Sequence, residues 1–105
     1  MPDNADFYNT LGLAEYRNDH WDEAISALNR AVDLHTGADP TDFFFLAMAR
    51  WRRGHKSEAE QVFQRGVDAA GNKDTISGEL KMFWTEAARV LVNPAHPGIR
   101  KPPPP

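Results

Sequence analysis

Along most of the chain, apolar residues recur every three or four positions, which is the spacing of amphipathic α-helices. Two short polar breaks interrupt the pattern, Asn18-Asp19-His20 and Arg53-Gly54-His55. Asp39 followed by Pro40 marks a helix start, because a capping side chain and a proline in the first turn both favour a helix N-terminus. The pattern predicts helices at about 5–18, 21–35, 40–53, 57–70 and 76–92, and no strand.

The chain matches itself when it is shifted by 35 residues, which aligns residues 7–34 with residues 42–69. Nine aligned positions are identical, whereas composition alone would give roughly two. They are Leu11/Leu46, Ala14/Ala49, Arg17/Arg52, His20/His55, Glu23/Glu58, Ala24/Ala59, Arg30/Arg65, Val32/Val67 and Asp33/Asp68. A hairpin of two helices that occurs twice explains both the match and the polar breaks.

Each copy carries a set of apolar and small residues at positions typical of a helical repeat. These are Tyr8, Leu11-Gly12, Ala24, Leu28 and Ala31 in the first copy, and Leu46, Ala47, Gly54, Ala59 and Phe63 in the second. In this set the chain resembles the tetratricopeptide-repeat family over about residues 5–70, with departures from the family pattern at Glu15, Thr36 and Gly66. The resemblance implies an all-α, right-handed solenoid within a domain at 1–92. Its parts are repeat 1 at about 5–38, repeat 2 at about 40–73 and a C-terminal capping helix at about 76–92.

The last predicted helix fits the cap that a stack of hairpins requires, with one face on the last hairpin and one face toward solvent. Its apolar side carries Ile76, Leu80, Phe83, Ala87 and Leu91, and its other side carries Met82, Glu86 and Arg89. Trp84, Ala88 and Val90 widen the apolar stripe beyond one contact face. These three residues therefore predict a surface for self-association, or for the next repeat of a longer array.

Charge and composition exclude several classes of function. Lys and Arg number 12 against 15 Asp and Glu, for a net charge of −3, so the chain lacks the basic field that binds nucleic acid. It has no cysteine, and hence no disulfide, thiolate ligand or cysteine nucleophile. The first residues are polar and acidic rather than signal-like, and no apolar run reaches membrane-spanning length. We therefore predict a soluble, cytoplasmic domain without nucleic-acid or membrane partners, followed by a proline-rich tail at 93–105.

No group of residues has the spacing of a catalytic, cofactor or metal site. The histidines at positions 20, 35, 55 and 96 never lie one helical turn apart, and two of them are equivalent turn residues of the repeat. Carboxylates at the starts of the second helices favour the helix dipole, and the glycines form no phosphate loop. We predict that the chain is not an enzyme and binds neither a cofactor nor a metal.

The first helix of each copy has a second stripe that the hairpin core does not need. In the tetratricopeptide-repeat family, such positions line a concave groove. Here they are Asn9, Leu13, Tyr16, Arg17, Phe44, Met48, Trp51 and Arg52. The resemblance implies a peptide groove with Phe44, Met48 and Trp51 as apolar anchors and with arginines at its rims. Tyr16 and Trp51 have an alternative role, which is packing between the two first helices.

We predict that the domain binds a peptide or protein segment in this groove. Relatives that grip a C-terminal carboxylate carry lysine and asparagine where this chain has Asn9 and Leu13, so the resemblance disfavours a chaperone-tail ligand. The second copy also resembles repeats appended to bacterial multidomain signalling proteins with serine/threonine kinase or WD40 domains. Two alternatives stay open: a self-associating structural module, and an appended regulatory segment of a larger signalling protein.

Overall fold

Five α-helices account for most of the described chain. The computed structural model describes residues 4–35, 39–72 and 74–92, and these ranges contain no strand. Their helices are α1 (Ala5–Arg17), α2 (Trp21–Leu34), α3 (Pro40–Arg52), α4 (Lys56–Ala70) and α5 (Gly78–Val92). The predicted all-α class is confirmed, and the first four helices match their predicted bounds to within one residue. α5 begins at Gly78 rather than at 76, because the Ser77 hydroxyl accepts a hydrogen bond from the Leu80 N–H at 3.1 Å and so caps the helix there. The tail predicted at 93–105 lies outside the described residues.

The backbone repeats itself at the shift of 35 residues that the sequence shows. Asn4 caps α1, where its side-chain oxygen accepts hydrogen bonds from two backbone N–H groups at 2.9 and 3.2 Å. At the equivalent position, Asp39 caps α3 by accepting a hydrogen bond from the N–H of Thr41 at 3.0 Å. The turns inside the two helix pairs also match, with Asp19 at φ 63° and Gly54 at φ 87°. The predicted repeat of one helical hairpin is therefore present in the backbone.

Small residues let the two helices of each pair approach closely. Ala24 on α2 is fully buried. Gly12 on α1 has no room for a side chain, because a Cβ atom built on it would lie 2.4 Å from Cγ of Leu28. A Cβ atom on Gly66 would meet a ring carbon of Phe44 at 2.8 Å. Glycine at position 66 thus has a physical reason, which is the large ring of Phe44 beside it.

We expect Gly12→Ala to lower the free energy of unfolding by about 1–3 kcal/mol, because overpacking against Leu28 outweighs the better helix propensity of alanine. Gly78→Ala is the matched control: a Cβ atom there meets nothing within 4 Å, so stability stays the same or rises. Urea unfolding followed by circular dichroism measures both changes. A Gly12→Ala protein as stable as its parent would place this face of α1 away from α2.

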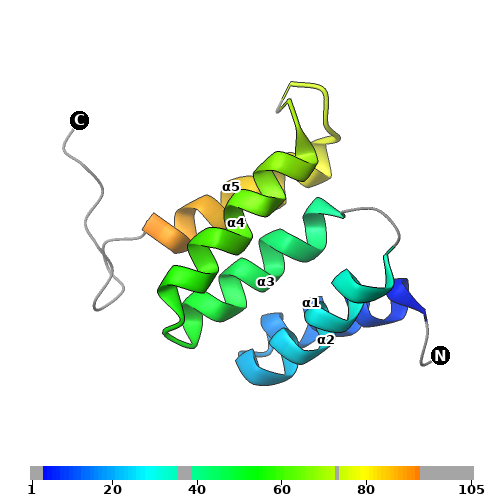
Figure 1. Cartoon of the computed structure of the whole chain (residues 1–105), viewed down its shortest axis with the longest axis vertical. Coiled ribbons are helices and arrows are strands. Elements are labelled where there is room, and N and C mark those ends of the chain that lie inside the picture. Colours follow the sequence, from blue (N-terminus) through cyan, green and yellow to red (C-terminus); the bar gives the residue numbers. More distant parts are fainter. Residues whose placement is uncertain (1–3, 36–38, 73, 93–105) are drawn as a thin grey trace.

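α3 lies at the centre of the helical arrangement (Figure 1). α1 packs against α2, α3 packs against α4, and α2 joins the two pairs by packing against α3. α5 does not repeat this step onto α4; it packs mainly against α3. The residues of α3 from Asp42 to Ala49 are all buried as a result.

Candidate interaction surfaces

α5 covers the face of α3 on which the sequence analysis places the peptide groove. The ring centroids of Phe44 and Trp84 lie 5.6 Å apart, and Phe45 meets Phe83 edge to face at 4.9 Å. Aromatic pairs at such separations add to the stabilisation that comes from apolar burial. This face of α3 is therefore filled by the chain's own last helix.

Phe44, Met48 and Trp51, the three predicted apolar anchors, belong to the core. Phe44 and Met48 have no exposed surface, and Trp51 is buried as well. They are not accessible to a ligand, so the prediction of an apolar groove at these residues is wrong. The physical reason is that α3 packs against α1, α2, α4 and α5, which leaves none of its apolar sides open.

The first-copy residues of the predicted groove also have structural roles. Tyr16 is buried and meets Phe45 edge to face at 5.7 Å between ring centroids, and burial raises the pKa of its hydroxyl. Leu13 is half-buried against the same core. Asn9 donates a hydrogen bond to the Asp42 carboxylate at 2.5 Å. The packing alternative is therefore confirmed for Tyr16, and Asn9 serves the junction between the helix pairs.

The two arginines of the predicted groove remain at the surface. Arg17 forms an ion pair with Glu86 of α5, in which one N–H···O distance is 2.8 Å, and this hydrogen bond raises the pKa of the guanidinium group. Arg52 donates a hydrogen bond to the Tyr16 hydroxyl at 3.5 Å and stands over the Trp21 ring at 5.7 Å. Arg17 thus links α1 to α5, although an exposed ion pair of this kind contributes about 1 kcal/mol at most.

Two of the three residues predicted for self-association, Trp84 and Val90, pack within the chain. Val90 is buried and cannot form such a surface, so the prediction is wrong for this residue. Trp84 is half-buried and stacks on Phe44, and Ala88 is half-buried too. The wide apolar stripe of α5, from which self-association was predicted, is accounted for because this helix lies across α3.

An open cleft remains between the C-terminal end of α1 and the outer side of α5, and we call it the Met82 cleft. Its volume is about 540 Å³, and its lining residues are Arg17, Lys81, Met82, Phe83, Thr85, Glu86 and Arg89. Met82 is 69% exposed, more than any other large apolar side chain in the described residues. The sequence pattern places Met82 on the outer side of the helix. It does not show whether Met82 belongs to a binding surface or is an ordinary solvated residue.

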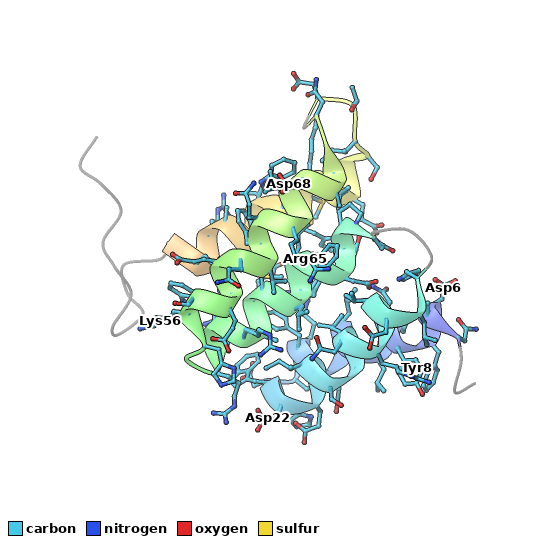
Figure 2. All side chains as sticks on the ribbon, in the orientation of Figure 1. Asp6, Tyr8, Asp22, Lys56, Arg65 and Asp68 are labelled. Atoms are coloured by element: carbon cyan, nitrogen blue, oxygen red, sulfur yellow. The ribbon has the colours of Figure 1, made fainter. Side chains whose placement is uncertain are left out.

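A second cleft lies between α1 and α2, and we call it the Leu11 cleft. Its volume is about 560 Å³, and its lining residues are Tyr8, Leu11, Glu15, Glu23, Ser26, Ala27, Asn29, Arg30 and Asp33. Leu11 is 38% exposed, whereas its repeat equivalent Leu46 is 3% exposed. Figure 2 shows Tyr8 on the side of the molecule away from α4 and α5. The repeat pattern includes Leu11 but does not reveal its exposure, because the pattern is the same for a covered and an uncovered helix.

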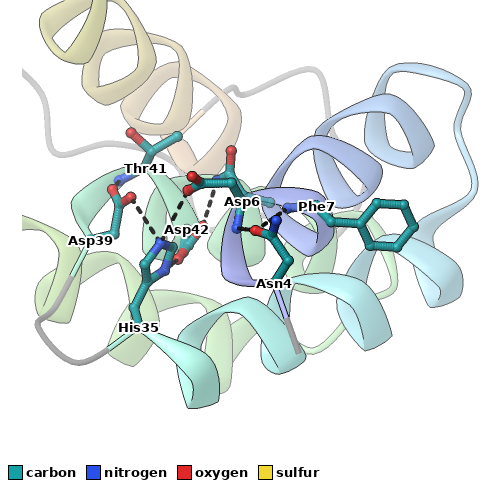
Figure 3. Close-up of polar contacts among 8 residues, drawn as sticks. Asn4, Asp6, Phe7, His35, Asp39, Thr41 and Asp42 are labelled. Carbon is teal, nitrogen blue, oxygen red and sulfur yellow. Dashed lines mark hydrogen bonds and ion pairs between the residues drawn. The ribbon is translucent and has the colours of Figure 1, made fainter. Parts of the chain in front are cut away.

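A polar cluster joins the two helix pairs (Figure 3). Asp42 on α3 is completely buried, and its carboxylate accepts hydrogen bonds from Nδ2 of Asn9 and Nδ1 of His35, each at 2.5 Å. The other ring nitrogen of His35, Nε2, lies 3.7 Å from a carboxylate oxygen of Asp6 and from one of Asp39. α1, α2 and α3 are thereby held together at one end.

Burial and charge shift the pKa of both partners in this cluster. Burial lowers the pKa of His35. The charge and hydrogen bond of Asp42, together with the charges of Asp39 and Asp6, outweigh this effect of burial, so the pKa of His35 lies above its ordinary value. Burial raises the pKa of the Asp42 carboxyl, and the hydrogen bonds from Asn9 and His35 oppose this only in part. The sequence does not reveal this pair, since His35 at a helix end and Asp42 in a first turn each have an ordinary local explanation.

His35, Asp39 and Asp42 also form a group in the described residues that could hold a metal ion, because one ligand atom from each lies within 4.8 Å of the others. His35 Nδ1 and Asp42 Oδ2 are 2.5 Å apart. Two ligands bonded to one zinc ion at about 2.1 Å stand roughly 3 Å or more from each other. The pair as it stands is therefore a hydrogen-bonded ion pair that fixes α2 on α3.

Comparisons of the chain with protein-family models, with curated proteins and with solved structures find no match. Among the described residues, no helix combines the length and the apolar character needed to cross a membrane. The two clefts and their charges are therefore the basis on which a function can be assigned.

Proposed function

We propose that the chain is a protein-interaction module, a short right-handed solenoid of two tetratricopeptide-like hairpins with α5 as its closing helix, which binds a segment of another polypeptide in the Met82 cleft. The observation that carries the proposal is the exposure of Met82 inside a cleft of about 540 Å³. Large apolar side chains exposed in a concave, charge-rimmed surface are typical of binding sites. The function predicted from the sequence is thus kept, but its site moves from α3 to the outer side of α5.

The charges of the cleft indicate what the ligand contains. Lys81 and Arg89 are exposed and lie in the lining beside Met82. They favour carboxylates in the ligand and speed its approach at low salt. Arg17 is already paired with Glu86, so it orders the rim of the cleft. The flexible thioether of Met82 accommodates apolar side chains of different shapes. We therefore propose a ligand in which an apolar residue is flanked by acidic residues.

A peptide array tests this proposal with the isolated chain and with its Met82→Glu variant. The probes are peptides that combine a leucine or phenylalanine with two or three aspartates. We expect the retained peptides to bind Met82→Glu at least tenfold more weakly, which corresponds to about 1.4 kcal/mol. The variant keeps its thermal stability, because the replaced side chain is mostly exposed.

Glu79→Gln is the control for this experiment, since Glu79 is exposed on α5 but does not line the cleft. It changes one charge on the same helix and is expected to leave peptide affinity unchanged. Retention of no acidic and apolar peptide, or equal affinity for the parent and Met82→Glu, would refute the proposed function.

A further inference from the structure

The repeat shows what kind of element the Leu11 cleft is shaped to receive. α2 packs against α3, and Phe43 and Leu46 of α3 are buried. Tyr8 and Leu11 stand at the same two repeat positions on α1. The described residues contain no helix before α1, and Leu11 is correspondingly exposed. The Leu11 cleft is therefore an uncovered counterpart of the position that α2 occupies on α3, and it has the shape to take a helix.

The charge of the Leu11 cleft selects among helices. Glu15, Glu23 and Asp33 line it, with Arg30 as the one cationic residue in the lining. The whole first helix pair has the same bias, because residues 4–35 contain six carboxylates and two arginines. A helix that fits this cleft needs an apolar residue for Leu11 and basic residues for the carboxylates around it.

The outer side of α5 has these properties. Met82 supplies the exposed apolar side chain, and Lys81 and Arg89 lie in the same surface. The Met82 cleft and the Leu11 cleft are thus complementary in charge, and an exposed apolar side chain lines each of them. α5 is also a helix of 15 residues, long enough to lie along the cleft between α1 and α2.

We propose that the partner bound at the Met82 cleft is a second copy of this chain, whose Leu11 cleft receives the outer side of α5. Met82 of one copy lies against Leu11 of the next, and Lys81 and Arg89 face the carboxylates of its first helix pair. The inference rests on the proposed function, since it names the partner of the same site. The two surfaces are different, so each added copy leaves one of each open, and the assembly grows copy by copy beyond a dimer, as an open chain or as a ring where the ends meet.

One-sided variants test this arrangement by analytical ultracentrifugation. Met82→Glu blocks the α5 surface and keeps the Leu11 cleft, whereas Leu11→Glu blocks the cleft and keeps the α5 surface. We expect the mean mass of the parent to rise with concentration beyond that of a dimer. For each variant alone, we expect the dissociation constant for self-association to rise at least tenfold. An equimolar mixture of the two variants forms a heterodimer and nothing larger.

Glu23→Lys repeats the cleft test at an exposed residue, so a folding defect of Leu11→Glu cannot decide the outcome. We expect it to weaken association as Leu11→Glu does, and we expect added salt to weaken association of the parent. A parent that stays monomeric at about 1 mM, or variants that associate as the parent does, would overturn the inference. If such a monomer still binds acidic peptides through Met82, the second copy is excluded and the proposed function stands. If Met82-dependent binding is absent as well, both fail.

Discussion

Met48→Glu is expected to unfold the protein rather than to weaken the binding of a ligand. Met48 has no exposed surface and lies in the apolar cluster around α3. Loss of a buried methionine costs about 2–5 kcal/mol, and a carboxylate without a partner in the same place costs several more. Together these terms approach the whole stability of a domain, which is roughly 5–15 kcal/mol. Loss of the helical circular dichroism signal at 25 °C is the measurement.

Met82→Glu is the matched control, because it makes the same chemical change at a side chain that is 69% exposed. We expect it to change the free energy of unfolding by less than about 0.5 kcal/mol. A folded Met48→Glu protein, with a melting temperature near that of its parent, would return Met48 to the surface. The groove that the sequence predicts on α3 would then be open after all.

The second large effect is expected at His35. Removing its ring by His35→Ala leaves the buried Asp42 carboxylate with Asn9 as its hydrogen-bond donor and without the imidazole. Breaking a buried ion pair by removing one partner costs about 3–5 kcal/mol, and because His35 is partly exposed we expect about 2–4 kcal/mol. Urea unfolding measures the loss. A loss below about 0.5 kcal/mol would show that the pair does not hold α2 on α3.

The same pair makes stability depend on pH. The pKa of His35 is raised, so the native protein holds the imidazolium proton more tightly than the unfolded chain does. This stabilisation is complete below about pH 6.5, the ordinary pKa of histidine, and is lost as pH rises through the raised native pKa. The raised pKa of Asp42 also makes stability fall as pH rises, because ionisation of the buried carboxyl is unfavourable. This effect acts at lower pH than that of His35, in the range where the carboxyl of Asp42 ionises.

We therefore expect the urea midpoint of the parent to fall between pH 6 and pH 9, and that of His35→Gln to change less. His20→Gln is the control, because His20 lies at an exposed turn and pairs with Glu15. The pH dependence of this variant shows what the loss of a histidine outside the polar cluster does. A parent midpoint that rises over this interval would contradict the direction assigned to the pKa of His35.

The helices were predictable from the sequence because their determinants are local. Asn4 and Asp39 cap the helices that follow them, and the positive φ of Asp19 and Gly54 suits residue types that tolerate a left-handed turn. The close approach inside the first hairpin also depends on one residue, since Gly12 stands where a larger side chain would strike Leu28. Each of these features acts over a few residues or between neighbouring helices.

The candidate site could not be predicted in the same way, because it depends on where α5 packs. The stripe with Phe44 and Met48 has the spacing of a groove surface and equally the spacing of a core surface. Trp84 and Phe83 decide between the two by packing on α3, and no repeat pattern specifies that choice. Met82 becomes a candidate only after the opposite side of α5 is known to be covered.

The central position of α3 bears on how the protein unfolds. In an extended repeat array each unit touches its neighbours only, so the end units can fray while the middle stays folded. Here α3 packs against all four other described helices, and α5, the last of them, is tied to the middle rather than to the end. Melting of the first hairpin would uncover α3 on one side, and melting of the second would also remove the support of α5. The chain is therefore a repeat in its sequence but a single cooperative unit in its thermodynamics, for which one unfolding transition is expected.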